Sequence, residues 1–207
     1  MPADARNFKA PFISQQQCWA AADAFRKQYW PSGELPVDVE AISTFELELE
    51  IRPISGLKDD DVDALLLGDW KTIIVDQQQY MDDRFVNRLR FSIAHELGHF
   101  VLHKDVFGQF PRSTADEWIR FCQDMPDKEY SFLEYHANEF AGRLLVPAHD
   151  LSTEFEAALR EVEGRGMARG KLTEDHLSYL CIPVAKRFAV SQEVIERRLT
   201  KEKLWPL

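Results

Sequence analysis

The stretch "RFSIAHELGHFVLH", residues 90–103, contains three histidines at intervals of four and a glutamate directly after the first of them. On a helix with about 100° per residue, His95 and His99 lie about 40° apart on one face. The opposite face is apolar and contains Ile93, Leu97, Phe100 and Val101. The pattern therefore predicts a helix over residues 85–103 that buries one face and presents two imidazoles on the other.

Two further helices are predicted before this one. Residues 14–30 are amphipathic, with Ser14 as a helix N-cap and Pro31 just beyond their end. Residues 35–45 form a shorter helix that Pro36 opens.

Three short strands are predicted between these helices and the histidines. Residues 46–54 alternate polar and apolar side chains, which is typical of a half-buried strand. Residues 64–76 contain two β-rich runs around Gly68 and Asp69, which indicates a hairpin. We expect an α+β fold, mainly helical, with a small three-stranded antiparallel sheet packed beside the helix of residues 85–103.

The rest of the chain is predicted to be helical. A long connection over residues 104–130 leads to a second helix at 131–147, and further helical segments follow, broken by a surface turn at 163–171. We expect residues 1–147 to form one domain, with residues 148–207 as a C-terminal helical region packed on it.

Composition narrows the class of protein. The 207 residues carry a net charge of −10, which makes nucleic acid an unlikely partner. No apolar run is long enough to span a membrane, and the first residues lack the apolar core of a signal peptide. Three scattered cysteines form no CxxC pair and suggest a reducing compartment, so the expected location is the cytoplasm.

His95, Glu96 and His99 form an HExxH motif, which in a helix is typical of metallopeptidases. The two imidazoles reach one cation, with zinc as the expected metal and Mn²⁺, Fe²⁺ or Co²⁺ as possible substitutes. Glu96 projects about 100° round from His95, where it reaches a water on the open side of the metal. It is the expected general base.

The third metal ligand is expected from the second helix. Glu134 shares a face with Asn138, and alanines on the same side allow close packing against the first helix. Glu134 is therefore the expected ligand, with Glu139 as the alternative, and Asn138 is expected to hydrogen-bond a ligand histidine. His136 points away from Glu134, and His103 is expected to support the site without binding the metal.

The two motifs "RFSIAHELGHFVLH" (90–103) and "EYHANEFAGRLLVP" (134–147) together resemble the ImmA/IrrE family of zinc metallopeptidases, which is gluzincin-like. The resemblance implies an endopeptidase whose substrate is a helix-turn-helix repressor or an antitoxin, so that cleavage regulates transcription. It implies metal binding and catalysis by His95, His99, Glu134 and Glu96.

Two other functions fit parts of the sequence. Residues 183–207 carry six basic and three acidic side chains, which would suit a DNA-binding regulator. A metal-dependent hydrolase of a non-peptide amide would use the same motif.

Two features of the catalytic site stay open at this point. Tyr80, Tyr130, Tyr135 or an arginine could supply the oxyanion donor, and the strand at residues 71–76 could bind an extended peptide along its edge.

Overall fold

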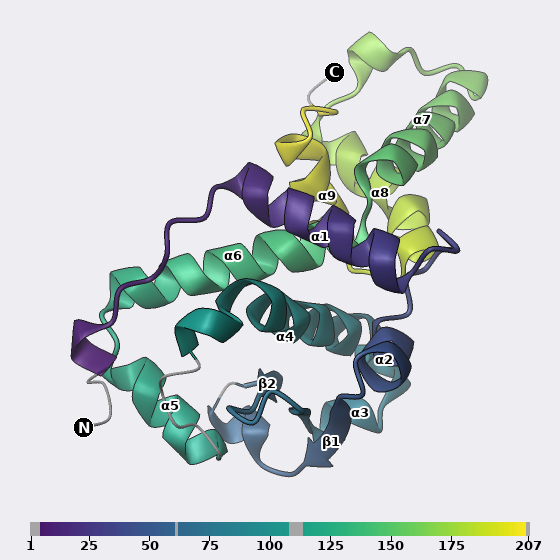
Figure 1. The fold of residues 1–207 in the computed structure, drawn as a ribbon. Helices are drawn as coiled ribbons and strands as arrows, with labels where there is room; N and C mark the ends of the chain where they lie inside the picture. Colours follow the sequence, from purple (N-terminus) through teal and green to yellow (C-terminus); the bar gives the residue numbers. More distant parts are fainter. Residues whose placement is uncertain (1–4, 61, 108–113, 206–207) are drawn as a thin grey trace.

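The computed structural model describes residues 5–60, 62–107 and 114–205 (Figure 1). Its sheet has three strands in the order β1-β3-β2. The strand bounds are Glu50–Ile54 for β1, Ala64–Leu66 for β2 and Thr72–Asp76 for β3. All five residues of the central strand β3 are buried.

The sheet is mixed, so the prediction of an antiparallel sheet was wrong for one pair. β2 and β3 pair antiparallel and form the predicted hairpin, whereas β1 pairs parallel with β3. The chain leaves β1, forms β2 on the far side of the sheet and only then returns between them as β3. Polar–apolar alternation identifies a half-buried strand but contains no information about its direction.

The loop between β2 and β3 is held by the side chain of Asp69. Its carboxylate accepts hydrogen bonds from the backbone N–H of Lys71 at 2.8 Å and of Thr72 at 3.0 Å, and from the Thr72 hydroxyl at 2.8 Å. Asp69 thereby satisfies the polar groups of the turn that the Gly68–Asp69 pair predicted.

The first long helix, α1 (Gln15–Tyr29), begins where the sequence predicts. Ser14 and Gln17 cap it reciprocally. The predicted helix at 35–45 begins later, because Asp38 and not Pro36 is its N-cap. Its remainder comprises α2 (Val39–Ala41) and a π-helical turn, η2 (Ile42–Glu46).

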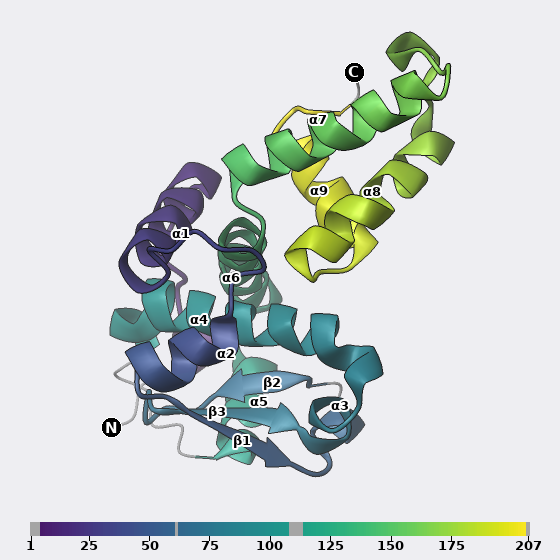
Figure 2. The same cartoon turned by 90° about the vertical axis from the view of Figure 1, so that its right-hand side faces the viewer.

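The longest helix, α4 (Val86–Phe107), lies over the sheet, and α6 (Asp127–Leu145) runs beside α4 on its other side (Figures 1 and 2). α1 packs against α6. A helix that was not predicted, α5 (Ala115–Asp124), lies within the long connection, of which residues 108–113 are outside the described ranges. α4 is thus covered on both sides, which gives its side chains defined neighbours.

The C-terminal helices extend away from the sheet (Figure 2). Their bounds are Ala148–Gly164 for α7, Glu174–Phe188 for α8 and Gln192–Lys201 for α9. The remaining short elements are η1 (Ala5–Asn7), η3 (Leu57–Asp60), α3 (Gln77–Tyr80), η4 (Asp83–Phe85) and η5 (Arg169–Lys171).

One buried apolar cluster spans the residues before and after position 147. It includes Ile73 of β3, Ile93 of α4 and Phe140 of α6, and it continues into Leu151 and Phe155 of α7. The division at residue 147 into a domain and an appended region stays a prediction. Within the described ranges, no helix combines the length and apolar character that a membrane span requires.

Candidate metal centre

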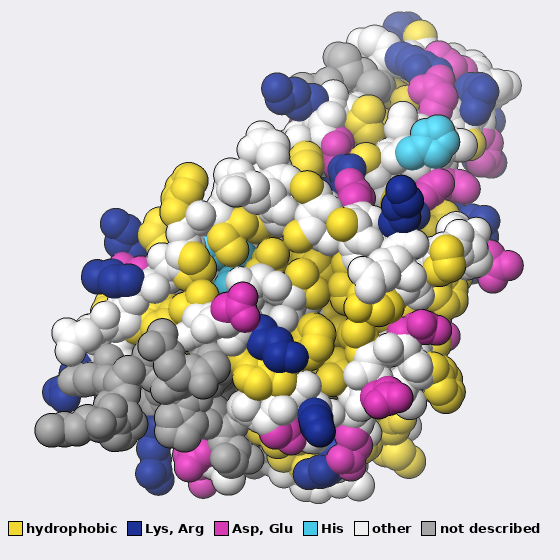
Figure 3. All heavy atoms as spheres, viewed as in Figure 1, with side chains coloured by type: hydrophobic (Ala, Val, Ile, Leu, Met, Phe, Trp, Pro, Cys, Tyr) yellow, Lys and Arg dark blue, Asp and Glu magenta, His cyan; other side chains and the backbone are white. Residues whose placement is uncertain are grey.

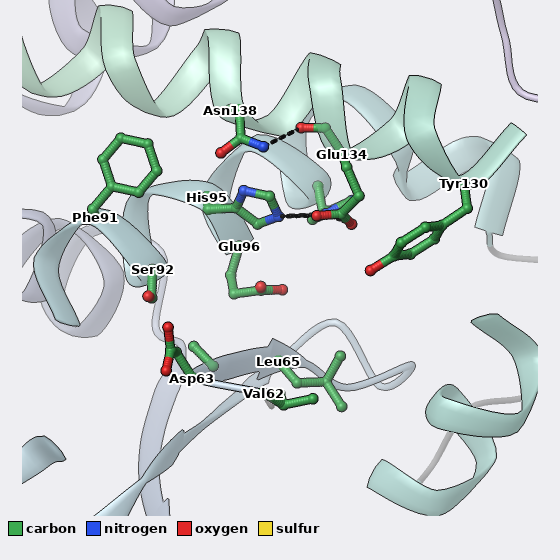
Figure 4. Close-up of a pocket in the computed structure, with 12 residues that line it drawn as sticks. Val62, Asp63, Leu65, Phe91, Ser92, His95, Glu96, Tyr130, Glu134 and Asn138 are labelled. Carbon is green, nitrogen blue, oxygen red and sulfur yellow. Dashed lines mark hydrogen bonds and ion pairs between the residues drawn. The ribbon is translucent and has the colours of Figure 1, made fainter. Parts of the chain in front are cut away.

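Three side chains from α4 and α6 converge in the structure (Figure 4). The Nε2 atoms of His95 and His99 lie 3.0 Å apart. The Glu134 carboxylate approaches both, with one oxygen 3.3 Å from His95 Nε2 and the other 3.4 Å from His99 Nε2. Among the described residues these three form a group that could hold a metal ion, with donor atoms within 4.8 Å of one another.

The donor set fits a divalent cation. Zinc binds nitrogen and oxygen ligands at about 2.0–2.2 Å, so the ligands of a tetrahedral ion lie about 3.3 Å from one another. The three separations between His95, His99 and Glu134 match that spacing. Two imidazoles and one carboxylate also leave a coordination position for water or substrate, as catalytic sites require.

Glu134 reaches the histidines because α4 and α6 pack closely at Gly98. A Cβ atom on Gly98 would lie 2.9 Å from the Cα of Ala137 and 3.1 Å from its carbonyl oxygen. Both of those atoms belong to the backbone, so no side-chain rotation would relieve the contact. The missing side chain of Gly98 thus sets the distance at which α6 presents Glu134.

The carboxylate of Glu134 also forms ion pairs with both imidazoles. Burial disfavours the charged form of His95, but the hydrogen bond and charge of Glu134 outweigh burial and raise the pKa of the imidazole to about 9. Although burial alone would raise it, the hydrogen bonds of His95 and His99 hold the pKa of the Glu134 carboxyl below its usual range. A cation that binds at neutral pH therefore displaces a proton.

Glu96 lies between α4 and the sheet, with its carboxylate directed into the same pocket (Figure 4). One of its oxygens accepts a hydrogen bond from the backbone N–H of Leu66, at 2.8 Å. Burial raises the pKa of the Glu96 carboxyl, and the charges of His99 and His95 and the Leu66 N–H limit that rise. A carboxylate in this position, with a raised pKa, suits a group that accepts and returns a proton.

The proposed ligands and Glu96 line one pocket of the structure. His95, Glu96, His99 and Glu134 line a pocket of about 300 Å³, which opens between α4, α6 and β2. Tyr130 also lines it, and its hydroxyl points towards Glu134 (Figure 4). Burial and the charge of Glu134 raise the pKa of the Tyr130 phenol, so the phenol keeps its proton. Neither Tyr80 nor Tyr135 is among the described residues that line this pocket.

The floor of the pocket is formed by β2, not by the strand that the sequence suggested. The predicted peptide-binding strand at 71–76 corresponds to β3, whose two edges are occupied by β1 and β2. β2 is one of the two edge strands of the sheet. The pocket is lined by Ala64 and Leu65 of β2 and by Val62 and Asp63 just before it. The strand order decides which strand has an open edge, and that order depends on contacts between distant segments of the chain.

Phe91 and Ser92 were also missed as pocket residues. They lie four and three residues before His95, hence on its face of α4. That spacing is the signal by which the sequence could have identified them.

The remaining predicted residues have distinct positions. The Asn138 side chain donates a hydrogen bond to the Glu134 carbonyl at 2.8 Å and lies beside His95 (Figure 4). Glu139, the alternative ligand, faces away from the pair of histidines, accepts a hydrogen bond from Trp19 Nε1 at 2.9 Å and ion-pairs with Lys201.

His103 lies behind the site and is fully buried. Its Nδ1 lies 2.9 Å from Nδ1 of His99, and its Nε2 lies 3.3 Å from Nδ1 of His136. His136 was expected to point away from the metal, and it lies outside the donor group but contacts it through His103. The structure therefore links four histidines in one row.

One family model matches the chain. It is Peptidase_M78, the IrrE N-terminal-like domain, and the match covers residues 86–200. That range contains His95, Glu96, His99 and Glu134. No curated protein matches the chain.

Among solved structures, the chain is similar to a Mycobacterium tuberculosis transcriptional regulator, with a TM-score of 0.52 and 16% identity. The match covers 87% of this chain and 46% of the regulator, so the chain spans about half the length of that protein. At this identity the similarity concerns the fold alone.

Proposed function

The chain belongs to the Peptidase_M78 family of IrrE N-terminal-like domains, and on that premise we propose that it is a zinc-dependent endopeptidase that cleaves a protein partner. One observation carries the proposal. Two imidazoles of α4 and a carboxylate of α6 meet at ligand spacing, beside the buried carboxylate of Glu96. Mn²⁺, Fe²⁺ or Co²⁺ would suit the same donors.

In this proposal His95, His99 and Glu134 hold the cation. When bound, it supplies Lewis acidity, which lowers the pKa of a water from about 15.7 towards 7 and polarises the scissile carbonyl. Glu96 removes a proton from the attacking water and later delivers it to the leaving amine. Asn138, which lies beside His95 (Figure 4), would orient its imidazole.

The outer edge of β2 supplies a place for an extended substrate. Leu67 N–H pairs with β3, so the alternation along the strand turns the backbone groups of Ala64 and Leu66 outward. The Leu66 N–H already donates a hydrogen bond to the Glu96 carboxylate. A peptide that pairs with the outward groups of Ala64 would pass directly beneath the metal ligands, which suits cleavage within a chain.

We propose a helix-turn-helix repressor or an antitoxin as the natural substrate, so that cleavage alters transcription. The support for this class is the motif resemblance to the ImmA/IrrE family. The name of the similar solved structure, a transcriptional regulator, is compatible with a role in regulation.

DNA binding through α8 and α9 is less favoured. Arg198 is buried and ion-pairs with Glu202, and Lys201 ion-pairs with Glu139, so two of the basic side chains are already neutralised within the fold. Basic and acidic side chains are interspersed on the face drawn in Figure 3, including the part formed by the C-terminal helices. A net charge of −10 further opposes attraction to phosphate.

The test is cleavage by the purified chain of candidate helix-turn-helix regulators, with zinc and with excess chelator, read out by intact mass. We expect two fragments whose masses sum to the substrate plus one water, and no fragments with chelator. Hydrolysis of small amides without cleavage of any protein would favour the non-peptide hydrolase instead. Salt-dependent binding to duplex DNA without hydrolysis would favour the regulator.

Replacing Tyr130 with phenylalanine tests the oxyanion donor. Because the Tyr130 hydroxyl points into the pocket, we expect kcat to fall about 100-fold while zinc content and KM change little. Steady-state kinetics on a peptide spanning the cleavage site measure this. Tyr80→Phe is the matched control, since Tyr80 lies on α3 outside the pocket. Equal kcat values for Tyr130→Phe and the parent protein would assign the oxyanion to another donor.

A further inference from the structure

Two buried histidines of the row are not needed to complete the donor set. His103 on α4 is 0% exposed and His136 on α6 is 1% exposed. Burying a polar ring is costly unless its nitrogens are hydrogen-bonded. Each neutral imidazole has one N–H donor and one acceptor nitrogen, so a row of such rings can be assigned only in a consistent direction.

The direction is determined at the metal end of the row. In the proposed site a cation binds the Nε2 lone pair of His99, so the proton of this neutral ring must be on Nδ1. Nδ1 of His99 lies 2.9 Å from Nδ1 of His103, and it donates to that nitrogen.

The assignment then passes along the row. His103 Nδ1 is an acceptor, so in the neutral ring Nε2 carries the proton. Nε2 donates to Nδ1 of His136, 3.3 Å away, which is the acceptor at the end of the row. His99 Nε2 faces the other two ligands, 3.4 Å from Glu134 and 3.0 Å from His95 Nε2.

The opposite direction of the row is incompatible with the metal site. It would place a proton on His99 Nε2, in the space where the cation binds.

From this geometry we propose that His136 is a positioning residue: through His103 it holds His99 in the Nδ1–H form and thereby raises the affinity of the site for a divalent cation. The inference rests on the metal site of the proposed function. It extends that site from its three ligands to a buried histidine of α6 that lies behind His103.

The test compares zinc affinity in the full chain, measured by competition with a chromophoric chelator. His136→Phe keeps a ring in place but removes the acceptor, and we expect the affinity to fall about 10- to 100-fold. His136→Asn restores an acceptor and should stay within about threefold of the parent protein. His149→Phe, which changes an exposed histidine of α7, should have no effect.

The tautomers of the parent protein provide a second measurement, which does not depend on any variant folding. Long-range ¹H–¹⁵N NMR spectra of the zinc-bound chain should show His103 and His136 protonated at Nε2. A proton on Nδ1 of His103, unchanged zinc affinity in His136→Phe, or equal losses in His136→Phe and His136→Asn would overturn the inference. If the parent chain bound no zinc, the proposed function itself would fail.

Discussion

Replacing Glu96 with glutamine should abolish peptide hydrolysis while the metal stays bound. Glutamine keeps the size of the side chain and can still accept the Leu66 N–H, but it cannot take a proton from water. Loss of a general base lowers the rate by about 10²- to 10⁴-fold, so kcat on a peptide substrate should fall by at least about 100-fold. Zinc content, measured by mass spectrometry of the native protein, should stay at that of the parent.

His95→Ala is the informative comparison for this variant. It removes a proposed ligand, so we expect both metal and activity to be lost. Full activity in Glu96→Gln would show that another group acts as the base. A loss of zinc from Glu96→Gln as large as that from His95→Ala would place Glu96 among the ligands.

Replacing Gly98 with alanine should weaken metal binding although Gly98 contributes no donor atom. The added Cβ would lie 2.9 Å from the Cα of Ala137, so α6 must move away from α4 and take Glu134 with it. We expect zinc affinity to fall by at least about 10-fold, by analogy with the loss of a supporting contact. The free energy of unfolding should fall by about 1–3 kcal/mol, as is usual for an overpacked core.

Gly164→Ala is the matched control. Gly164 ends α7, and in the described part of the chain a Cβ built there meets no heavy atom within 4 Å beyond its chain neighbours and the backbone of its own helix. Its zinc affinity and urea midpoint should equal those of the parent protein or slightly exceed them, because alanine is the better helix former. Unchanged zinc affinity in a folded Gly98→Ala protein would show that the separation of the two helices does not control the site.

The positions of the two histidines on one helix face could be predicted because helical periodicity alone decides them. The spacing of four places His95 and His99 on one face, whatever lies around the helix. The same argument favoured Glu134 over Glu139 as the third ligand, because the two side chains project from different sides of α6. The structure brings Glu134 to the histidines and places Glu139 beside Trp19 and Lys201.

The remainder depends on contacts between distant segments, which local patterns do not contain. Alternation in residues 46–54 indicated a strand but could not show that β1 pairs parallel with β3. The edge position of β2 follows from the same strand order, and the predicted strand at 71–76 is wrong as an edge strand because β3 has a neighbour on each side. His136 appeared unrelated to the metal because only tertiary packing places it against His103.

Anomalous diffraction from crystals of the full chain grown with zinc, measured on both sides of the zinc absorption edge, would locate the metal directly. We expect one zinc peak, about 2.0–2.2 Å from Nε2 of His95, Nε2 of His99 and a carboxylate oxygen of Glu134. A peak bound through Nδ1 of His99, a peak held by other side chains, or no peak between α4 and α6 would contradict this expectation.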